Sequence, residues 1–82
     1  MNRALSIEIL ADEIYRVVDQ QQGKRYLRAG DLTQMMIERF GEECSKDNCR
    51  QAIHRLIDSG RCVYSYFGAS YVTLPLKAKR QP

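Results

Sequence analysis

The chain has few of the residues on which small catalytic or metal-binding domains depend. It contains one histidine, three cysteines and no tryptophan. Cys44, Cys49 and Cys62 form no Cys-x2-Cys pair, so their spacing does not match a structural zinc site. No glycine-rich phosphate loop is present, and His54 is the sole histidine available as a base for a nucleophile. We therefore expect a protein that is not an enzyme and that holds no metal or cofactor.

Long apolar runs and an export signal are also missing. No apolar stretch approaches the roughly 20 residues of a membrane-spanning helix. Acidic residues interrupt the N-terminal MNRALSIEILADE, where a signal peptide needs an apolar core. We expect a cytoplasmic protein without membrane contact, in which the cysteines stay reduced. Cys49 and Cys62 suit the core, whereas Cys44 lies in a connection and is expected to be the most exposed thiol.

The residues that are present suit one soluble globular domain. The chain has 82 residues, of which 44% are hydrophobic and 28% charged. Its net charge of +3 is unevenly distributed along the sequence. Residues 1–44 contain six Lys/Arg and eight Asp/Glu, a charge of −2, whereas residues 45–82 contain seven Lys/Arg and two Asp/Glu, a charge of +5. This distribution fits an anionic partner of the C-terminal half. We expect one domain over residues 1–76 and a basic, flexible tail over 77–82.

Three segments repeat apolar residues at helical spacing. They extend over residues 6–22, 31–41 and 46–59. Ser6, Asp31 and Ser45 are the expected N-caps, and Gln34 completes a capping box with Asp31. The second segment is apolar on most sides, so we expect that helix to be well buried.

The remaining segments have the pattern of strands. KRYLRAG predicts one short strand around Leu27, followed by a turn at Gly30. After Gly60 the period changes to roughly two, and RCVYSY and SYVTLP predict two strands joined by a turn through Gly68. The predicted order is helix, strand, helix, helix, strand, strand.

This order, with the helix–Ser–Gly–strand junction at residues 56–63, resembles the winged helix-turn-helix superfamily over about residues 6–75. The resemblance implies an α+β fold in which the third helix is the recognition helix, the hairpin is the wing and the short strand pairs with it. The Z-DNA-binding branch of that superfamily pairs an Asn and a Tyr on this helix with a Trp on the wing. Arg50 and His54 occupy those helix positions and no Trp exists, so we do not expect that activity.

The outer face of the third helix carries side chains that suit a reading of the major groove. The candidate base contacts are Asn48, Arg50, Gln51, His54 and Arg55. The candidate phosphate contacts are Lys46, Arg61, Lys77, Lys79 and Arg80. Arg pairs with guanine, and Asn or Gln with adenine, through two hydrogen bonds. We hypothesise a small protein that binds double-stranded DNA and regulates transcription, acting as a homodimer because two copies recognise paired half-sites.

Two observations keep other interpretations open. Any amphipathic helix needs a polar outer face, and two acids on this face, Asp47 and Asp58, would approach phosphates. The hairpin turn carries no charge, although wings that bind DNA usually place Lys or Arg there. Cross-strand packing accounts for two or three of the four hairpin aromatics. Tyr66 and Phe67 are the expected contacts with unpaired bases or a protein, and the alternative function is a protein-interaction module that does not bind DNA.

Overall fold

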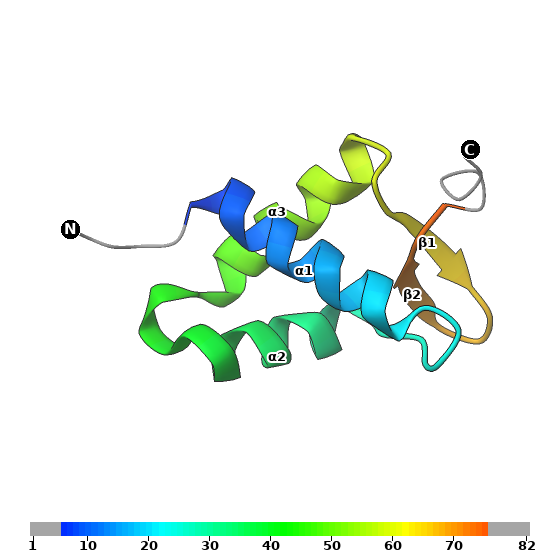
Figure 1. Ribbon diagram of the computed structural model, residues 1–82, viewed down its shortest axis with the longest axis horizontal. Coiled ribbons are helices and arrows are strands. Elements are labelled where there is room, and N and C mark those ends of the chain that lie inside the picture. The colour runs from blue at the N-terminus through cyan, green and yellow to red at the C-terminus, as the bar shows by residue number, and fades with distance from the viewer. Residues whose placement is uncertain (1–5, 76–82) are drawn as a thin grey trace.

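The structure, a computed structural model, describes residues 6–75 and has three helices followed by a hairpin (Figure 1). The helices are α1 (Ile7–Gln21), α2 (Ala29–Phe40) and α3 (Lys46–Asp58), with a 3-10 turn η1 (Gly41–Glu43) before α3. The strands are β1 (Val63–Tyr66) and β2 (Ser70–Thr73). The fold is therefore α+β, with the helices on one side and the hairpin at one end. Among these helices, none has the length and apolar character required to cross a membrane.

The first and third helices begin where the sequence predicts. The Ser6 hydroxyl accepts a hydrogen bond from the backbone N–H of Ile9 at 3.1 Å. The Ser45 hydroxyl accepts one from the N–H of Asn48, also at 3.1 Å. Each cap satisfies a donor that lacks a partner within its helix. At the other end of α3, Gly60 has a φ of +83°, which lets the chain reverse into the hairpin.

The start of α2 differs from the prediction. The helix begins at Ala29, so Arg28 is the N-cap, and the expected cap at Asp31 and turn at Gly30 are wrong. The Asp31 carboxylate lies at the third helical position and accepts the backbone N–H of Arg28 at 3.0 Å. An acid there also suits the positive end of the helix dipole. The predicted capping box between Asp31 and Gln34 does not form, and the Gln34 side-chain amide donates to the Glu38 carboxylate at 3.2 Å.

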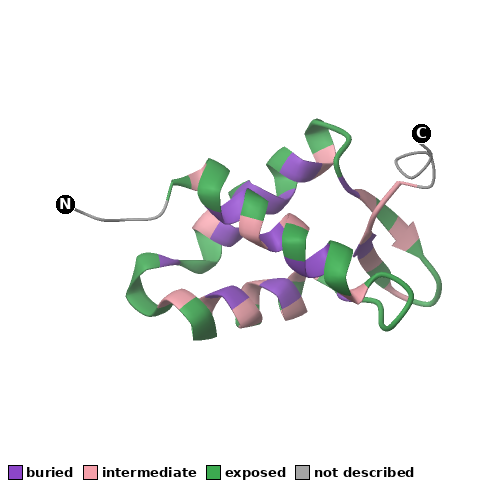
Figure 2. Cartoon of the chain, in the orientation of Figure 1, coloured by how far each residue is buried: buried purple, intermediate pink, exposed green. Residues whose placement is uncertain are grey.

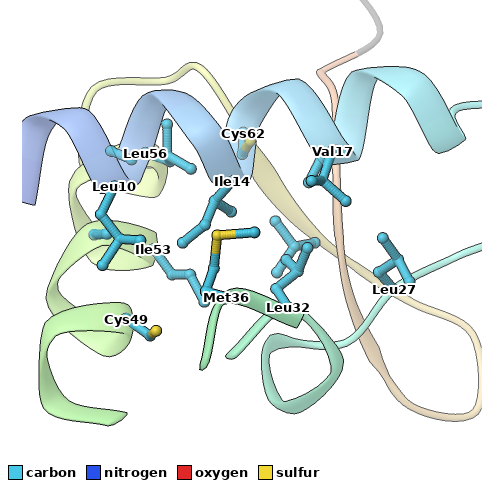
Figure 3. Close-up of a cluster of buried hydrophobic side chains, with 14 of the residues drawn as sticks. Leu10, Ile14, Val17, Leu27, Leu32, Met36, Cys49, Ile53, Leu56 and Cys62 are labelled. Carbon is cyan, nitrogen blue, oxygen red and sulfur yellow. The ribbon is translucent and has the colours of Figure 1, made fainter. Parts of the chain in front are cut away.

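The core lies where the three helices meet. In Figure 3, Leu10, Ile14 and Val17 point from α1 toward α2 and α3. The side chains that meet them include Leu32, Met36, Ile53 and Leu56, all fully buried. Figure 2 shows the buried positions on the facing sides of the helices. Burial of this apolar surface is the main stabilising term, at roughly 25 cal/mol per Å².

The second helix is less buried than expected. Only Leu32 and Met36 are buried, whereas Met35, Ile37 and Phe40 are half-buried. The physical reason is that α2 lies at one edge of the domain, so only one of its sides meets the other helices (Figures 1 and 2). Met35, Ile37 and Phe40 therefore pack against the core without being fully buried.

The expected exposure of Cys44 is wrong. The residue is 3% exposed, because it follows η1 in an extended conformation and belongs to the core cluster. The Cys44 Sγ lies 3.0 Å from the Cys49 Sγ. Burial, together with the neighbouring Cys44, raises the pKa of Cys49 to about 12. Burial also raises the pKa of Cys62 to about 11.

The hairpin attaches to the core through its second strand. β1 and β2 are antiparallel, with Val63 opposite Thr73, and Gly68 has a φ of +86° in the turn. The predicted short strand is reduced to a single bridge between Leu27 and Val72, whose N–H donates to the Leu27 carbonyl at 2.8 Å. Leu27 and Val72 are each 2% exposed, so this bridge is the buried base of the hairpin.

Candidate functional site

A row of side chains on α3 faces a hollow of about 510 Å³, which we call the α2–α3 hollow. Lys46, Arg50 and His54 recur every four residues and therefore lie on one side of the helix. Residues of α2 form the opposite wall, and Tyr64 of β1 completes the lining. All three α3 side chains are exposed, as predicted. The arrangement places an amino group, a guanidinium and an imidazole ring beside the first turns of a second helix.

One carboxylate on α3 binds two of the predicted base contacts. The Arg50 Nη2 lies 3.2 Å from one Asp47 oxygen, and the Gln51 Nε2 donates to the other at 2.7 Å. Asp47 lies in the first turn of α3, where an acid stabilises the helix dipole. These contacts are exposed, and exposed ion pairs contribute only about 0–1 kcal/mol. A phosphate or a base edge can therefore replace Asp47 as the partner of Arg50.

Two further arginines of the predicted site, Arg55 and Arg61, are bound to α1. The Arg55 Nη1 lies 3.5 Å from a Glu8 oxygen. The Arg61 Nη1 lies 2.9 Å from an Asp12 oxygen, and its guanidinium stands 4.4 Å from the Tyr15 ring centre. Arg55 and Arg61 are thus directed toward α1 and do not line the α2–α3 hollow.

The charge around α3 is consequently balanced. The helix α3 carries Lys46, Arg50 and Arg55 and the acids Asp47 and Asp58, and Glu8 of α1 pairs with Arg55. Arg61, which follows α3, pairs with Asp12 of α1. The positive charge that the sequence places in the C-terminal half is cancelled at this helix by acids from α1 and from α3 itself. A DNA interface here would use the Lys46–Arg50–His54 row rather than the whole outer face.

The structure gives the remaining predicted DNA contacts different positions. Asn48 is half-buried in the first turn of α3, and its N–H is bound by the Ser45 cap. Gln51 is exposed beside Asp47. The predicted tail contacts Lys77, Lys79 and Arg80 lie outside residues 6–75, as does the rest of the predicted tail.

Three aromatic rings meet beside the hairpin turn, and we call them the aromatic cluster. Phe67 lies 4.9 Å from Tyr26 and 5.5 Å from Tyr71, centroid to centroid, and Tyr26 lies 5.7 Å from Tyr71. Tyr26 is 60% exposed and Phe67 is 53% exposed. Tyr66, the other predicted contact, is 73% exposed and belongs to none of these pairs.

Sequence reasoning missed two features of this region. Tyr26 was expected only as part of a short strand, and no local pattern reveals its contact with a turn so distant in sequence. The expectation that cross-strand packing over the core would take two or three of the four hairpin aromatics is also wrong, because neither the core cluster nor the side chains packed against it include Tyr64, Tyr66, Phe67 or Tyr71. Leu27, Val72 and Cys62 occupy the buried positions at the base of the hairpin instead.

A second hollow, of about 530 Å³, lies beside the aromatic cluster between the end of α1 and the hairpin; we call it the hairpin hollow. Tyr26 and Phe67 line it together with Arg25. No aspartate or glutamate is among its lining residues in the described part of the chain. The α2–α3 hollow is likewise lined by no acid, but its Arg50 is paired with Asp47, whereas Arg25 pairs with no carboxylate among residues 6–75.

Residues 6–75 contain no group of three histidine, cysteine or carboxylate side chains positioned to hold a metal ion. Comparison of the chain with protein-family models, with characterised proteins and with solved structures found no match. The two hollows are therefore the features of the molecule from which a function can be inferred.

Proposed function

We propose that the chain is a winged helix-turn-helix protein that binds double-stranded DNA as a transcriptional regulator. In this proposal α2 and α3 form the helix-turn-helix, α3 is the recognition helix and the β1–β2 hairpin is the wing. The element order supports it, as does the bridge between Leu27 and Val72, where the short strand of such a fold would pair with the wing.

The observation that carries the proposal is the Lys46–Arg50–His54 row facing the start of α2. An α-helix fits the major groove of B-DNA, and its N-terminal half usually contacts the bases. Lys46 would bind a phosphate, and Arg50 would pair with guanine after leaving Asp47. His54 and Gln51 would add hydrogen bonds along the same groove.

The ion pairs determine how strong this binding can be. With Arg55 and Arg61 bound to α1 carboxylates, few cations among residues 6–75 of one copy face the DNA. Phosphate contacts supply most of the affinity of such proteins, so one copy that makes few of them binds weakly. We therefore propose that a homodimer is needed for specific binding.

The test is fluorescence anisotropy with a labelled duplex at increasing salt. Affinity is expected to fall steeply from low to moderate salt, and Lys46→Ala with Arg50→Ala to reduce it by more than tenfold at low salt. Arg39→Ala is the matched control, because Arg39 is also an exposed arginine paired with a carboxylate, Glu13, but lies on α2 outside the hollow. Absence of duplex binding by the wild-type protein at low salt removes the proposal.

The second candidate function is a protein-interaction module that does not bind DNA. The balanced charge around α3 favours it, and the exposed aromatic cluster offers the surface. Under this alternative, Phe67→Ala loses a specific captured partner while Tyr66→Ala retains it, and both variants keep the wild-type circular dichroism spectrum. A partner list that Phe67→Ala leaves unchanged counts against this alternative.

A further inference from the structure

The aromatic cluster and the hairpin hollow lie apart from the Lys46–Arg50–His54 row, and the proposed reading of the major groove does not use them. Tyr64 lines the α2–α3 hollow, whereas Phe67 and Ser65 line the hairpin hollow. The hairpin thus contributes side chains to two separate concave surfaces.

The aromatic cluster has the properties of a stacking surface. Tyr26 and Phe67 are more than half exposed, although aromatic rings of their size usually bury most of their area. Their contacts with each other and with Tyr71 restrict how they move without covering them. The rings come from the α1–α2 connection and from the hairpin, which the Leu27–Val72 bridge holds together.

The polar groups around these rings are cationic or neutral. Arg25 lines the hairpin hollow and Lys24 precedes it, and neither makes an ion pair with another described residue. Gln21 and Gln22 of the α1 end contribute side-chain amides. Unlike Arg50, Arg55 and Arg61, therefore, the basic side chains here have no carboxylate among residues 6–75 to displace.

We infer that the hairpin hollow binds an unpaired nucleotide of a single strand, with the base stacked on Phe67 and Tyr26 and the phosphate bound by Arg25. Every base presents a flat π face, so stacking on aromatic side chains suits single strands of any sequence. The volume of about 530 Å³ lies within the usual range of small-ligand sites. An apolar protein segment would cover the rings equally well but would leave Arg25 without an anionic partner.

This inference extends the proposed function, because the two surfaces would then bind one DNA molecule. The α3 row would contact the duplex and the hairpin hollow the first unpaired nucleotides beyond it. The preferred ligand is thus a duplex that ends in, or is interrupted by, a single strand.

The test compares a blunt duplex, the same duplex with a short oligothymidine extension, and the oligothymidine alone, at one low salt concentration. The wild-type protein is expected to bind the extended duplex about tenfold more tightly than the blunt one. Phe67→Ala, Tyr26→Ala and Arg25→Gln are each expected to remove most of that gain and to leave blunt-duplex affinity unchanged. Tyr66→Ala is the matched control, because it removes an even more exposed hairpin aromatic outside the cluster.

The outcomes separate the inference from the proposed function. Equal affinity for the blunt and extended duplexes overturns the inference and leaves duplex binding intact. Binding of oligothymidine that depends on Phe67, without any duplex binding, supports the inference and removes the major-groove proposal. Displacement by thymidine 5′-monophosphate at the affinity of the oligonucleotide overturns the assignment to a strand. A protein partner that depends on Phe67, with no oligonucleotide binding, overturns the inference in favour of the interaction module.

Discussion

The α2–α3 hollow and the hairpin hollow are similar in volume and differ in the partners of their basic side chains. Neither has an acid among its lining residues in the described part of the chain, but Arg50 in the first is paired with Asp47, whereas Arg25 in the second has no carboxylate partner among residues 6–75. Charge along the sequence suggests the opposite, since residues 1–44 carry −2 and residues 45–82 carry +5. In the folded chain, Glu8 and Asp12 of α1 pair with Arg55 and Arg61. Lys24 and Arg25 have no carboxylate partners among residues 6–75. Whether a basic side chain has a carboxylate partner thus depends on which elements pack together.

The largest expected effect is a loss of stability from a substitution in the core, which supports the elements that line both hollows. Ile14 of α1 is 0% exposed and lies among side chains from α2 and α3. Ile14→Ala is expected to lower the free energy of unfolding by about 2–5 kcal/mol, because it removes buried methyl groups and leaves a cavity. Urea denaturation followed by circular dichroism measures the change.

Ile9→Ala is the control, because Ile9 is 52% exposed on the same helix. Its expected effect is within about 0.5 kcal/mol. A loss below about 1 kcal/mol for Ile14→Ala, or equal losses for the two variants, would contradict the position of the core.

Raising the pH is expected to destabilise the core that Cys49 and Cys62 share. Cys49 is buried in α3 and Cys62 is buried just before β1, and burial raises their pKa values to about 12 and about 11. The thiols therefore stay protonated in the folded state after they begin to ionise in the unfolded chain. Their stabilising contribution is complete below the unfolded pKa near 9 and is lost as the pH rises toward 11 to 12.

Urea titrations at pH 8, 9 and 10 measure this dependence. Cys49→Ala and Cys62→Ala are each expected to reduce the fall in unfolding free energy with pH, compared with the wild-type protein. A wild-type slope that both variants reproduce would mean that other groups cause the fall.

The parts of the fold that followed from sequence are those set by local signals. Ser6 and Ser45 each precede a periodic apolar stripe, and both caps form. The predicted start of α2 was wrong because Asp31 suits either an N-cap or the third helical position, and no local sequence signal distinguishes these two positions. The burial of Cys44 depends on the path of η1, and the Tyr26–Phe67 contact joins distant segments, so neither has a local signal.

The candidate site was predictable only in part for the same reason. Helical spacing identified Arg50 and His54 as exposed neighbours, and the structure confirms their exposure. The i, i+3 spacing also allows the Asp47–Arg50 pair. The pairing of Arg55 and Arg61 with α1, by contrast, follows from the packing of α1 on α3, which periodicity alone does not give.

Removing one acid is expected to make the α2–α3 hollow more like the hairpin hollow. Asp47→Asn removes the ion pair with Arg50, leaves one side-chain oxygen to accept from Arg50 or Gln51, and takes a negative charge away from the proposed phosphate path. Duplex affinity at low salt is expected to rise about threefold to tenfold, with a steeper salt dependence. The loss of an acid from the first turn of α3 is expected to cost about 0.3–1 kcal/mol of stability. Anisotropy and urea denaturation measure the two effects.

The control for this variant is Asp19→Asn, which neutralises an exposed acid near the end of α1, away from α3. Equal gains in duplex affinity for the two variants would show that net charge, rather than the release of Arg50, determines binding. Reduced affinity for Asp47→Asn would mean that Asp47 holds Arg50 in its binding position.

The smallest expected effects come from removing the ion pairs that join Arg55 of α3, and Arg61 just after it, to α1. In a double-mutant cycle, Arg61→Ala and Asp12→Ala are expected to show a coupling of about 0.2–1 kcal/mol, and the longer Arg55–Glu8 pair a smaller one. Arg61→Ala alone is expected to cost more stability than Asp12→Ala, since the guanidinium also stacks on Tyr15. Neither change is expected to alter duplex affinity, because both pairs lie outside the α2–α3 hollow. If Arg61→Ala weakens duplex binding as much as Arg50→Ala does, Arg61 exchanges Asp12 for a phosphate, and the α1 side of α3 contacts DNA as well.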